Sequence, residues 1–311
     1  MGGITFLGRM NFSEINHGDC LSVGPSQGLV YTVDSGIVIK VPFQYPVTQN
    51  PDSHLLDLSL KSFVCLEREQ AVYAVLKTHP HPNIVRRLET DQLDCLFLER
   101  LTPLEAAWPD STESERRRWA LELLGAISWL EGHGWADGDL AIRNLGVDGT
   151  NRLKVFDFGS SINDSHPDYA NDIVRDPFDL ATCLNYILSG IDPFATARSY
   201  SDVKKIRTEL MEGRCSVGQA AEVLAGIIQG GWTVRGSSTG FSQLVEQASD
   251  ILGPLAGNIL PEHPEGHYGR LESRCRDWPR KSSRNEHWKN VDEYFLSCKS
   301  EGREADLEVW R

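Results

Sequence analysis

The middle of the chain carries acidic and amide side chains at close spacing. It reads Asp137-Gly138-Asp139-Leu140-Ala141-Ile142-Arg143-Asn144 and then, after a short apolar run, Asp157-Phe158-Gly159. Carboxylate and amide oxygens are ligands that suit Mg²⁺, and an aspartate beside a reacting hydroxyl can accept or orient its proton. Residues of these types could hold a divalent cation and handle a proton.

In this segment the chain resembles the eukaryotic protein kinase superfamily. That family has a catalytic loop of the form H-R-D-L-x-x-x-N and a metal-binding D-F-G motif. The spacing from Asp139 to Asn144 fits, and so does the strand leading into Asp157. Further stretches fit in order: Ile37–Lys40, Glu69, His81–Val85, Leu98–Leu101 and Asp176–Leu180. The resemblance covers residues 15–255, and the overall pattern resembles short, divergent kinase-like proteins of filamentous fungi.

The resemblance implies a role for each matching residue in phosphoryl transfer from ATP. Asp139 would accept or orient the proton of the attacking hydroxyl, and Arg143 would place a cation near the γ-phosphate. Lys40, held by Glu69, would contact the α- and β-phosphates, while Asn144 and Asp157 would bind Mg²⁺. The remaining positions implied for nucleotide binding are Gly24, Gly28, Val30, Val38, Glu99 and Leu101. Val38 and Leu98 would line the adenine pocket or serve only as core.

Either Glu67 or Glu69 could be the partner of Lys40. Choosing Glu69 places Tyr73 and Leu76 at the apolar offsets expected after that residue, whereas Glu67 would place alanines there. The sequence therefore favours Glu69, with a plain helix-surface charge as the alternative.

The chain departs from the kinase pattern at three places. The glycine-rich loop is degenerate, because Val23 and Pro25 stand where glycines are expected. Asp137-Gly138 replaces the His-Arg before the catalytic aspartate, so no arginine is available to sense a phosphorylated loop. The segment from Asp157 to Asp176 is short and lacks an A-P-E motif, which removes the usual peptide-docking platform. Gly138-Asp139 also resembles the H-G-D of aminoglycoside- and choline-type phosphotransferases.

The strands and helices that must position these residues can be predicted from hydrophobic periodicity and from turn and capping residues. Alternation at 29–33 and 36–41 around Asp34-Ser35-Gly36 predicts a hairpin. Helical spacing from residue 53 to 78 predicts one long helix, and 84–88 and 93–98 predict two more strands. Thr112 and Glu115 predict a capping box, and Asp176 is predicted as an N-cap with Pro177 at the first helical position.

These elements predict an α+β, bilobal, protein-kinase-like fold. The predicted parts are a strand-rich N-lobe with one helix at 15–101, a mainly helical C-lobe at 102–255 and a C-terminal extension at 256–311. The extension holds a basic stretch at 270–290 inside an acidic protein. We interpret it as a solvated tail or a surface that pairs with the acidic body, and alternatively as a docking patch for an acidic partner.

Composition restricts the partners and the compartment. A net charge of −13 argues against binding nucleic acid or an anionic membrane surface. Seven cysteines without a close pair indicate reduced, buried thiols in an intracellular compartment. The N-terminal residues lack a signal-peptide pattern, and no apolar stretch is long enough to span a bilayer. We expect an intracellular, cytoplasmic protein, with the nucleus open as an alternative and the oligomeric state undetermined.

The sequence thus predicts an ATP- and Mg²⁺-dependent protein kinase, acting on serine or threonine in preference to tyrosine. Arg143 resembles the tyrosine-kinase pattern D-L-A-x-R-N, but one arginine does not decide the acceptor. Two alternatives stay open: a pseudokinase that acts as a binding or scaffolding module, and a kinase of small molecules. The degenerate glycine loop favours the first of these, and the short segment after Asp157 favours the second.

Overall fold

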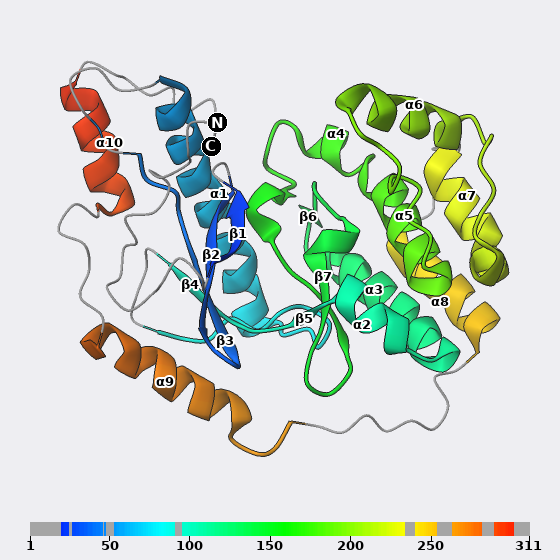
Figure 1. The fold of residues 1–311 in the computed structure, drawn as a ribbon, viewed down its shortest axis with the longest axis horizontal. Coiled ribbons are helices and arrows are strands. Elements are labelled where there is room, and N and C mark those ends of the chain that lie inside the picture. The colour runs from blue at the N-terminus through cyan, green and yellow to red at the C-terminus, as the bar shows by residue number, and fades with distance from the viewer. Residues whose placement is uncertain are drawn as a thin grey trace. The chain divides into compact units, whose positions relative to one another are not determined.

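The protein has an α+β fold, with a four-stranded antiparallel sheet and one long helix first and a mainly helical region with small sheets after it (Figure 1). The computed structural model describes residues 20–24, 27–45, 47, 53–90, 95–233, 240–253, 263–281 and 289–301. The chain forms two compact units. Unit 1 combines the chain up to Thr78 with 86–100 and the part from Pro264 onward, and unit 2 combines 79–85 with 101–263.

The sheet of unit 1 has the strand order β1-β2-β3-β4. Its strands are β1 (Cys20–Gly24), β2 (Gly28–Asp34), β3 (Ile37–Val41) and β4 (Leu96–Glu99). The predicted hairpin is confirmed: β2 pairs antiparallel with β3, and Asp34 Oδ1 accepts a hydrogen bond from Gly36 N at 2.8 Å across the turn. The long helix is α1 (Ser53–Thr78), which ends before His79-Pro80 as predicted.

The strand predicted at 84–88 does not form as a continuous strand. Ile84 makes an isolated parallel bridge to Val155, and Arg87 makes an isolated antiparallel bridge to Leu98. The segment passes from unit 2 to unit 1 between Val85 and Arg86, so its two ends pair with different strands. A change of partner within so short a segment leaves no signal in the sequence, because Ile84, Val85 and Leu88 are apolar whichever strand they pair with.

The C-terminal extension contributes two helices to unit 1, α9 (His267–Lys281) and α10 (Val291–Ser300). Leu271 and Cys275 of α9 are buried in the same apolar cluster as the sheet residues Tyr31, Ile37 and Ile39. Arg274 of the basic stretch lies 3.0 Å from the carboxylate of Asp34. Helix α9 therefore packs on the N-terminal sheet, and one of its arginines pairs with an acidic residue of the same unit.

Unit 2 is built around α3 and α5. Its helices are α2 (Leu104–Ala107), α3 (Glu113–Gly132), α4 (Tyr169–Asp172), α5 (Asp176–Ser189), α6 (Tyr200–Met211), α7 (Ala225–Thr233) and α8 (Phe241–Leu252). Two small sheets accompany them, with orders β5-β7-β8 and β6-β9. Their strands are β5 (Thr102–Pro103), β6 (Trp135–Ala136), β7 (Leu145–Val147), β8 (Leu153–Val155) and β9 (Ile162–Asn163). The remaining elements are short 3₁₀ turns at Trp108–Asp110, Ile142–Asn144, Phe158–Ser160 and Gln219–Leu224.

The two predicted helix starts have different outcomes. The capping box at Thr112 is confirmed: its hydroxyl accepts from Glu115 N, and the Glu115 carboxylate accepts from Thr112 N. The predicted N-cap at Asp176 is wrong by one residue, because Arg175 occupies the N-cap of α5 without a side-chain bond. The Asp176 side chain instead bonds to the loop that carries Asp139, as described below.

Burial of the cysteines agrees with the sequence prediction for most of them. Five are buried, namely Cys65, Cys95, Cys183, Cys275 and Cys298. Burial raises the pKa of the Cys275 thiol to about 12, so it stays protonated and unreactive near neutral pH. Among the described residues, no helix is both long and apolar enough to cross a membrane.

Candidate functional site

Unit 1 brings Lys40 and Glu69 together. Lys40 lies on β3, opposite Val30 of β2 and Leu96 of β4. Its Nζ lies 2.5 Å from Glu69 Oε2, and the two side chains are 4% and 0% exposed. The contact joins residues far apart in sequence, and it selects Glu69 over Glu67 as the partner of Lys40.

The positions implied for the nucleotide in unit 1 lie on the same sheet. Gly24 pairs with Gly28 at the end of the β1–β2 ladder, and residues 25 and 26 of the degenerate loop fall outside the described chain. Gly28 has φ of +108°, and a Cβ there would lie 2.8 Å from the Val41 carbonyl oxygen. Only glycine fits such a position without strain. Val30 lies beside Gly28 and is partly exposed, whereas Val38 is buried opposite Leu98.

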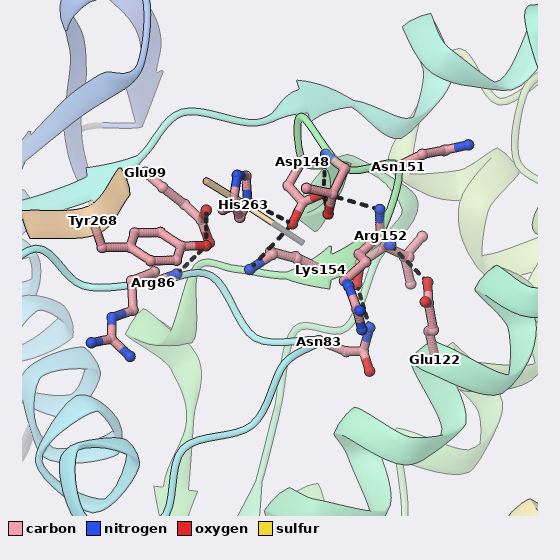
Figure 2. A network of polar contacts seen from close by, with 12 residues as sticks. Asn83, Arg86, Glu99, Glu122, Asp148, Asn151, Arg152, Lys154, His263 and Tyr268 are labelled. Carbon is pink, nitrogen blue, oxygen red and sulfur yellow. Dashed lines mark hydrogen bonds and ion pairs between the residues drawn. The ribbon is translucent and has the colours of Figure 1, made fainter. Parts of the chain in front are cut away.

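Both carboxylate oxygens of Glu99 accept hydrogen bonds from other residues of unit 1 (Figure 2). Glu99 Oε1 accepts from Arg86 N at 2.7 Å, and Oε2 accepts from the Tyr268 hydroxyl at 3.0 Å. Arg86 also lies over the Tyr268 ring, with its guanidinium carbon 5.3 Å from the ring centroid. This side chain ties α9 to the sheet, so a nucleotide contact at Glu99 would have to use its main chain. In unit 2, Leu101 packs against Gly146, where a Cβ would lie 2.8 Å from Leu101 Cβ.

Unit 2 brings Asp139, Arg143 and Asn144 together on one loop and 3₁₀ turn. One guanidinium nitrogen of Arg143 lies 2.7 Å from both carboxylate oxygens of Asp139. Asn144 Nδ2 donates to the Asp139 carbonyl oxygen at 2.9 Å, which leaves its side-chain oxygen as the acceptor that can face a cation. Asp139 is partly exposed, as a residue that meets a substrate must be.

Asp157 lies two residues after the end of β8 and adopts an unusual backbone conformation. Its φ and ψ are 69° and 68°, in the left-handed region that non-glycine residues seldom enter. The next residue, Phe158, is fully buried and anchors the turn. Phe156 N donates to the Asn144 carbonyl oxygen at 3.0 Å, so the turn carrying Asp157 is tied to the residue predicted to share its metal. Strain of this kind is concentrated at functional sites.

A buried carboxylate holds the loop before Asp139. Asp176 Oδ2 accepts from Asp137 N at 2.8 Å, and Asp176 Oδ1 accepts from Gly138 N at 3.0 Å. Asp137 Oδ1 in turn accepts from Asp139 N at 3.1 Å, and the Ser161 hydroxyl donates to the Asp137 carbonyl. The Asp176 carboxylate thus braces the backbone of the loop that carries Asp139.

This loop concentrates negative charge. Burial first, and then the charge of Asp176, raise the pKa of Asp137 well above its usual range. Burial raises the pKa of Asp176 to about 6, although its two backbone hydrogen bonds act in the opposite direction. Asp139 and Asp157 contribute further repulsion at Asp137. A cation among these carboxylates would relieve the repulsion, so the donor set of Asp157 and Asn144 fits Mg²⁺ in charge and in ligand type.

A second polar cluster of unit 2 was missed by the sequence analysis. Asp148, in the β7–β8 turn, accepts from Thr150 and Arg152 and lies 3.5 Å from Lys154 Nζ and 3.4 Å from His263 Nε2 (Figure 2). Burial raises the pKa of Asp148, but these hydrogen bonds and the Lys154 ammonium together hold it below its usual value. The D-x-T spacing of Asp148 and Thr150 is a turn signal, but nothing local indicates the contact with His263.

Neither a protein-family model nor a curated protein sequence matches the chain.

Proposed function

We propose that the protein is an ATP- and Mg²⁺-dependent phosphotransferase with a protein-kinase-like fold, which transfers the γ-phosphate to a protein hydroxyl, serine or threonine in preference to tyrosine. The buried Lys40–Glu69 pair carries this proposal. A buried ion pair contributes little net stability, because the cost of desolvating the two charges offsets the attraction between them. Its presence between an interior strand of the sheet and α1 favours a functional reason, namely holding the Lys40 ammonium ready for phosphate oxygens.

The arrangement of unit 1 supports the fold part of the proposal. The helix that supplies Glu69 lies in sequence between β3 and β4, and the lysine lies on the strand between β2 and β4. Both features are those that the resemblance implies for a kinase N-lobe. The left-handed Asp157 and the Asp176 brace in unit 2 are further features that agree with it.

Each residue then has a definite task. Asp139 orients the acceptor hydroxyl and receives its proton, and Arg143 offers positive charge beside it. Asn144 and Asp157 hold Mg²⁺, which when bound supplies positive charge to the phosphate oxygens. Lys40 holds further phosphate oxygens while Glu69 fixes its direction. The proposal requires that both sets of residues act on one nucleotide.

Control by phosphorylation of the segment after Asp157 is not part of the proposal. Gly138 occupies the position of the arginine that would read such a phosphate, and its backbone has φ of +77°. We therefore propose an enzyme that is competent without that modification.

One contact favours the alternative of a pseudokinase. Arg143 engages both oxygens of Asp139, which would have to be released before Asp139 could serve a substrate. A nucleotide-binding module without turnover fits this arrangement. The short segment from Asp157 to Asp176 favours a small-molecule acceptor as a third candidate.

Nucleotide binding tests the proposal and separates the candidates. We expect MgATP to raise the melting temperature of the protein, and Asp157→Ala to abolish the part of the shift that requires Mg²⁺. Asp164→Asn, an exposed acidic position of the same unit, is the matched control and should retain the shift. A shift without phosphate transfer to any acceptor would favour the pseudokinase, and transfer only to small molecules would favour the third candidate. Absence of any shift would contradict the proposal.

A further inference from the structure

The C-terminal helix α10 packs against the helix that supplies Glu69. Tyr294 and Cys298 of α10 are buried in one apolar cluster with Leu56, Leu60 and Phe63 of α1. The rings of Phe63 and Tyr294 lie with their centroids 5.2 Å apart, and Phe295 lies 6.0 Å from Phe63. Aromatic pairs at these distances contribute beyond the area they bury. The two helices therefore form one packed layer within unit 1.

The extended segment after β3 is bonded to α1 by two buried serines. Phe43 N donates to Ser62 Oγ at 2.8 Å, and Tyr45 N donates to Ser59 Oγ at 2.8 Å. Both serines are fully buried. Because backbone groups buried without partners are costly, each bond fixes the segment at a definite position along α1.

The same segment is held from its other side by the extension. The Tyr294 hydroxyl donates to the Tyr45 carbonyl oxygen at 2.7 Å. Gln44 Nε2 donates to the Lys289 carbonyl at 2.6 Å, and Lys289 N donates back to Gln44 Oε1 at 3.2 Å. Residues 43–45 are thus bonded alternately to α1 and to the extension.

These contacts bear directly on the candidate ion pair. The segment begins two residues after the end of β3, the strand of Lys40, and Ser62 lies about two helical turns before Glu69 on α1. A helix moves as a rigid rod over such a length, so displacement of α1 at Ser62 displaces Glu69 as well. The 2.5 Å contact between Lys40 and Glu69 does not survive a shift of that kind.

We propose that α10 is a positioning element for the Lys40–Glu69 pair: it clamps residues 43–45 and α1 together and so keeps Glu69 against Lys40. The consequence for catalysis rests on the proposed function, whereas the clamp itself does not. Tyr294 is the central positioning residue, since it joins both partners with its ring and its hydroxyl. A change that displaces α10 from α1 would weaken nucleotide binding without altering a residue of the nucleotide site.

The test measures Lys40 itself. Full-length protein is treated with an amine-reactive acylating reagent, and the rate of acylation at Lys40 is followed by mass spectrometry. We expect slow reaction in the wild-type protein and a rise of about tenfold or more in Tyr294→Ala, because local opening exposes the amine. Leu296 lies on the same helix and is 67% exposed, so Leu296→Ala is the matched control and should leave the rate unchanged.

Tyr294→Phe covers the case in which Tyr294→Ala does not fold. It keeps the ring against Phe63 and removes only the bond to the Tyr45 carbonyl, so we expect a rise of roughly two- to tenfold. The variant whose Lys40 reacts fastest should also bind MgATP most weakly. Leu296→Ala should keep wild-type affinity.

The two proposals fail in different ways. If no variant and no wild-type preparation binds MgATP, the proposed function fails, and the labelling rates still report on the clamp. An unchanged Lys40 labelling rate in a folded Tyr294→Ala protein, or in Tyr294→Phe where the alanine variant does not fold, overturns the positioning role of α10.

Discussion

A Cβ atom at Gly138 would lie 2.7 Å from the carbonyl oxygen of Ser160. Gly138 also has φ of +77°, a conformation that side chains disfavour. The loop before Asp139 and the turn after Asp157 are therefore packed backbone to backbone at this point. The arginine that the kinase pattern places here has no room, so the missing side chain is a requirement of this packing.

Substitution of Gly138 should consequently destabilise the protein. We expect Gly138→Ala to lower the free energy of unfolding by at least ~1–2 kcal/mol from the backbone conformation, with more from the contact with Ser160. Gly230→Ala is the control, because Gly230 lies inside α7 with open space around its Cβ position. That variant should raise stability by up to about 1 kcal/mol. Urea unfolding of both measures the contrast, and equal effects would refute the packing argument.

Two substitutions of Asp157 should differ in stability and agree in their loss of nucleotide binding. Because its φ is 69°, Asp157→Gly should be more stable than Asp157→Ala by about 1–2 kcal/mol. Both variants lose the carboxylate, so both should lose Mg²⁺-dependent nucleotide binding. Thermal unfolding and calorimetric titration with MgATP measure the two effects. Retained binding in either variant would count against the metal role of Asp157.

The Lys40–Glu69 pair should give strong non-additivity in a double-mutant cycle. Lys40→Met or Glu69→Leu alone leaves a buried charge without its partner, and each should cost about 3–5 kcal/mol of stability. The double variant removes both charges and should cost less than the sum of the single variants. Chemical denaturation supplies the three values. Simple additivity would mean that the two side chains do not interact.

Glu122 of α3 should make stability depend on pH. Burial raises its pKa to about 7 from an ordinary 4.5, so the folded state binds this proton more tightly than the unfolded state. The free energy of unfolding should then fall as pH rises through this interval, by roughly 3 kcal/mol relative to Glu122→Gln. Glutamine keeps an oxygen to accept the 2.8 Å bond from Leu153 N. Parallel pH curves for the two proteins would show that Glu122 has an ordinary pKa.

Local signals accounted for much of the fold. The Asp34-Ser35-Gly36 turn, the end of α1 at Thr78 and the Thr112–Glu115 capping box each depend on residues close in sequence, and each was predicted. The partner of Lys40 was predicted because helical spacing separates Glu69 from Glu67. The start of α5 was missed by one residue because the Asp176 carboxylate bonds to a distant loop in place of its own helix.

The contacts of the extension could not be read from the sequence in the same way. Leu271 and Cys275 are buried on α9, a helix otherwise rich in arginine, and Tyr294 and Cys298 repeat that i, i+4 spacing on α10. Partly buried Tyr268 on α9 and Val291 and Phe295 on α10 extend these pairs to stripes at helical spacing. Such a stripe indicates that a helix has a buried face, but it does not say which element covers that face. The commitment of Glu99 to Tyr268 is likewise non-local, and so is the contact of Asp148 with His263. Such contacts depend on tertiary packing that no short window contains.

Transfer of labelled γ-phosphate from ATP tests the central claim most directly. Purified protein is incubated with γ-labelled ATP and Mg²⁺, with general protein substrates, beside an Asp139→Asn variant and a sample containing a chelator. We predict label on serine or threonine of protein with the wild-type enzyme, and a loss of at least about a hundredfold in the variant, since general-base catalysis contributes that much. Removal of Mg²⁺ should abolish transfer. Equal labelling by wild-type and Asp139→Asn protein, or no labelling of any acceptor by the wild-type protein, would contradict the account.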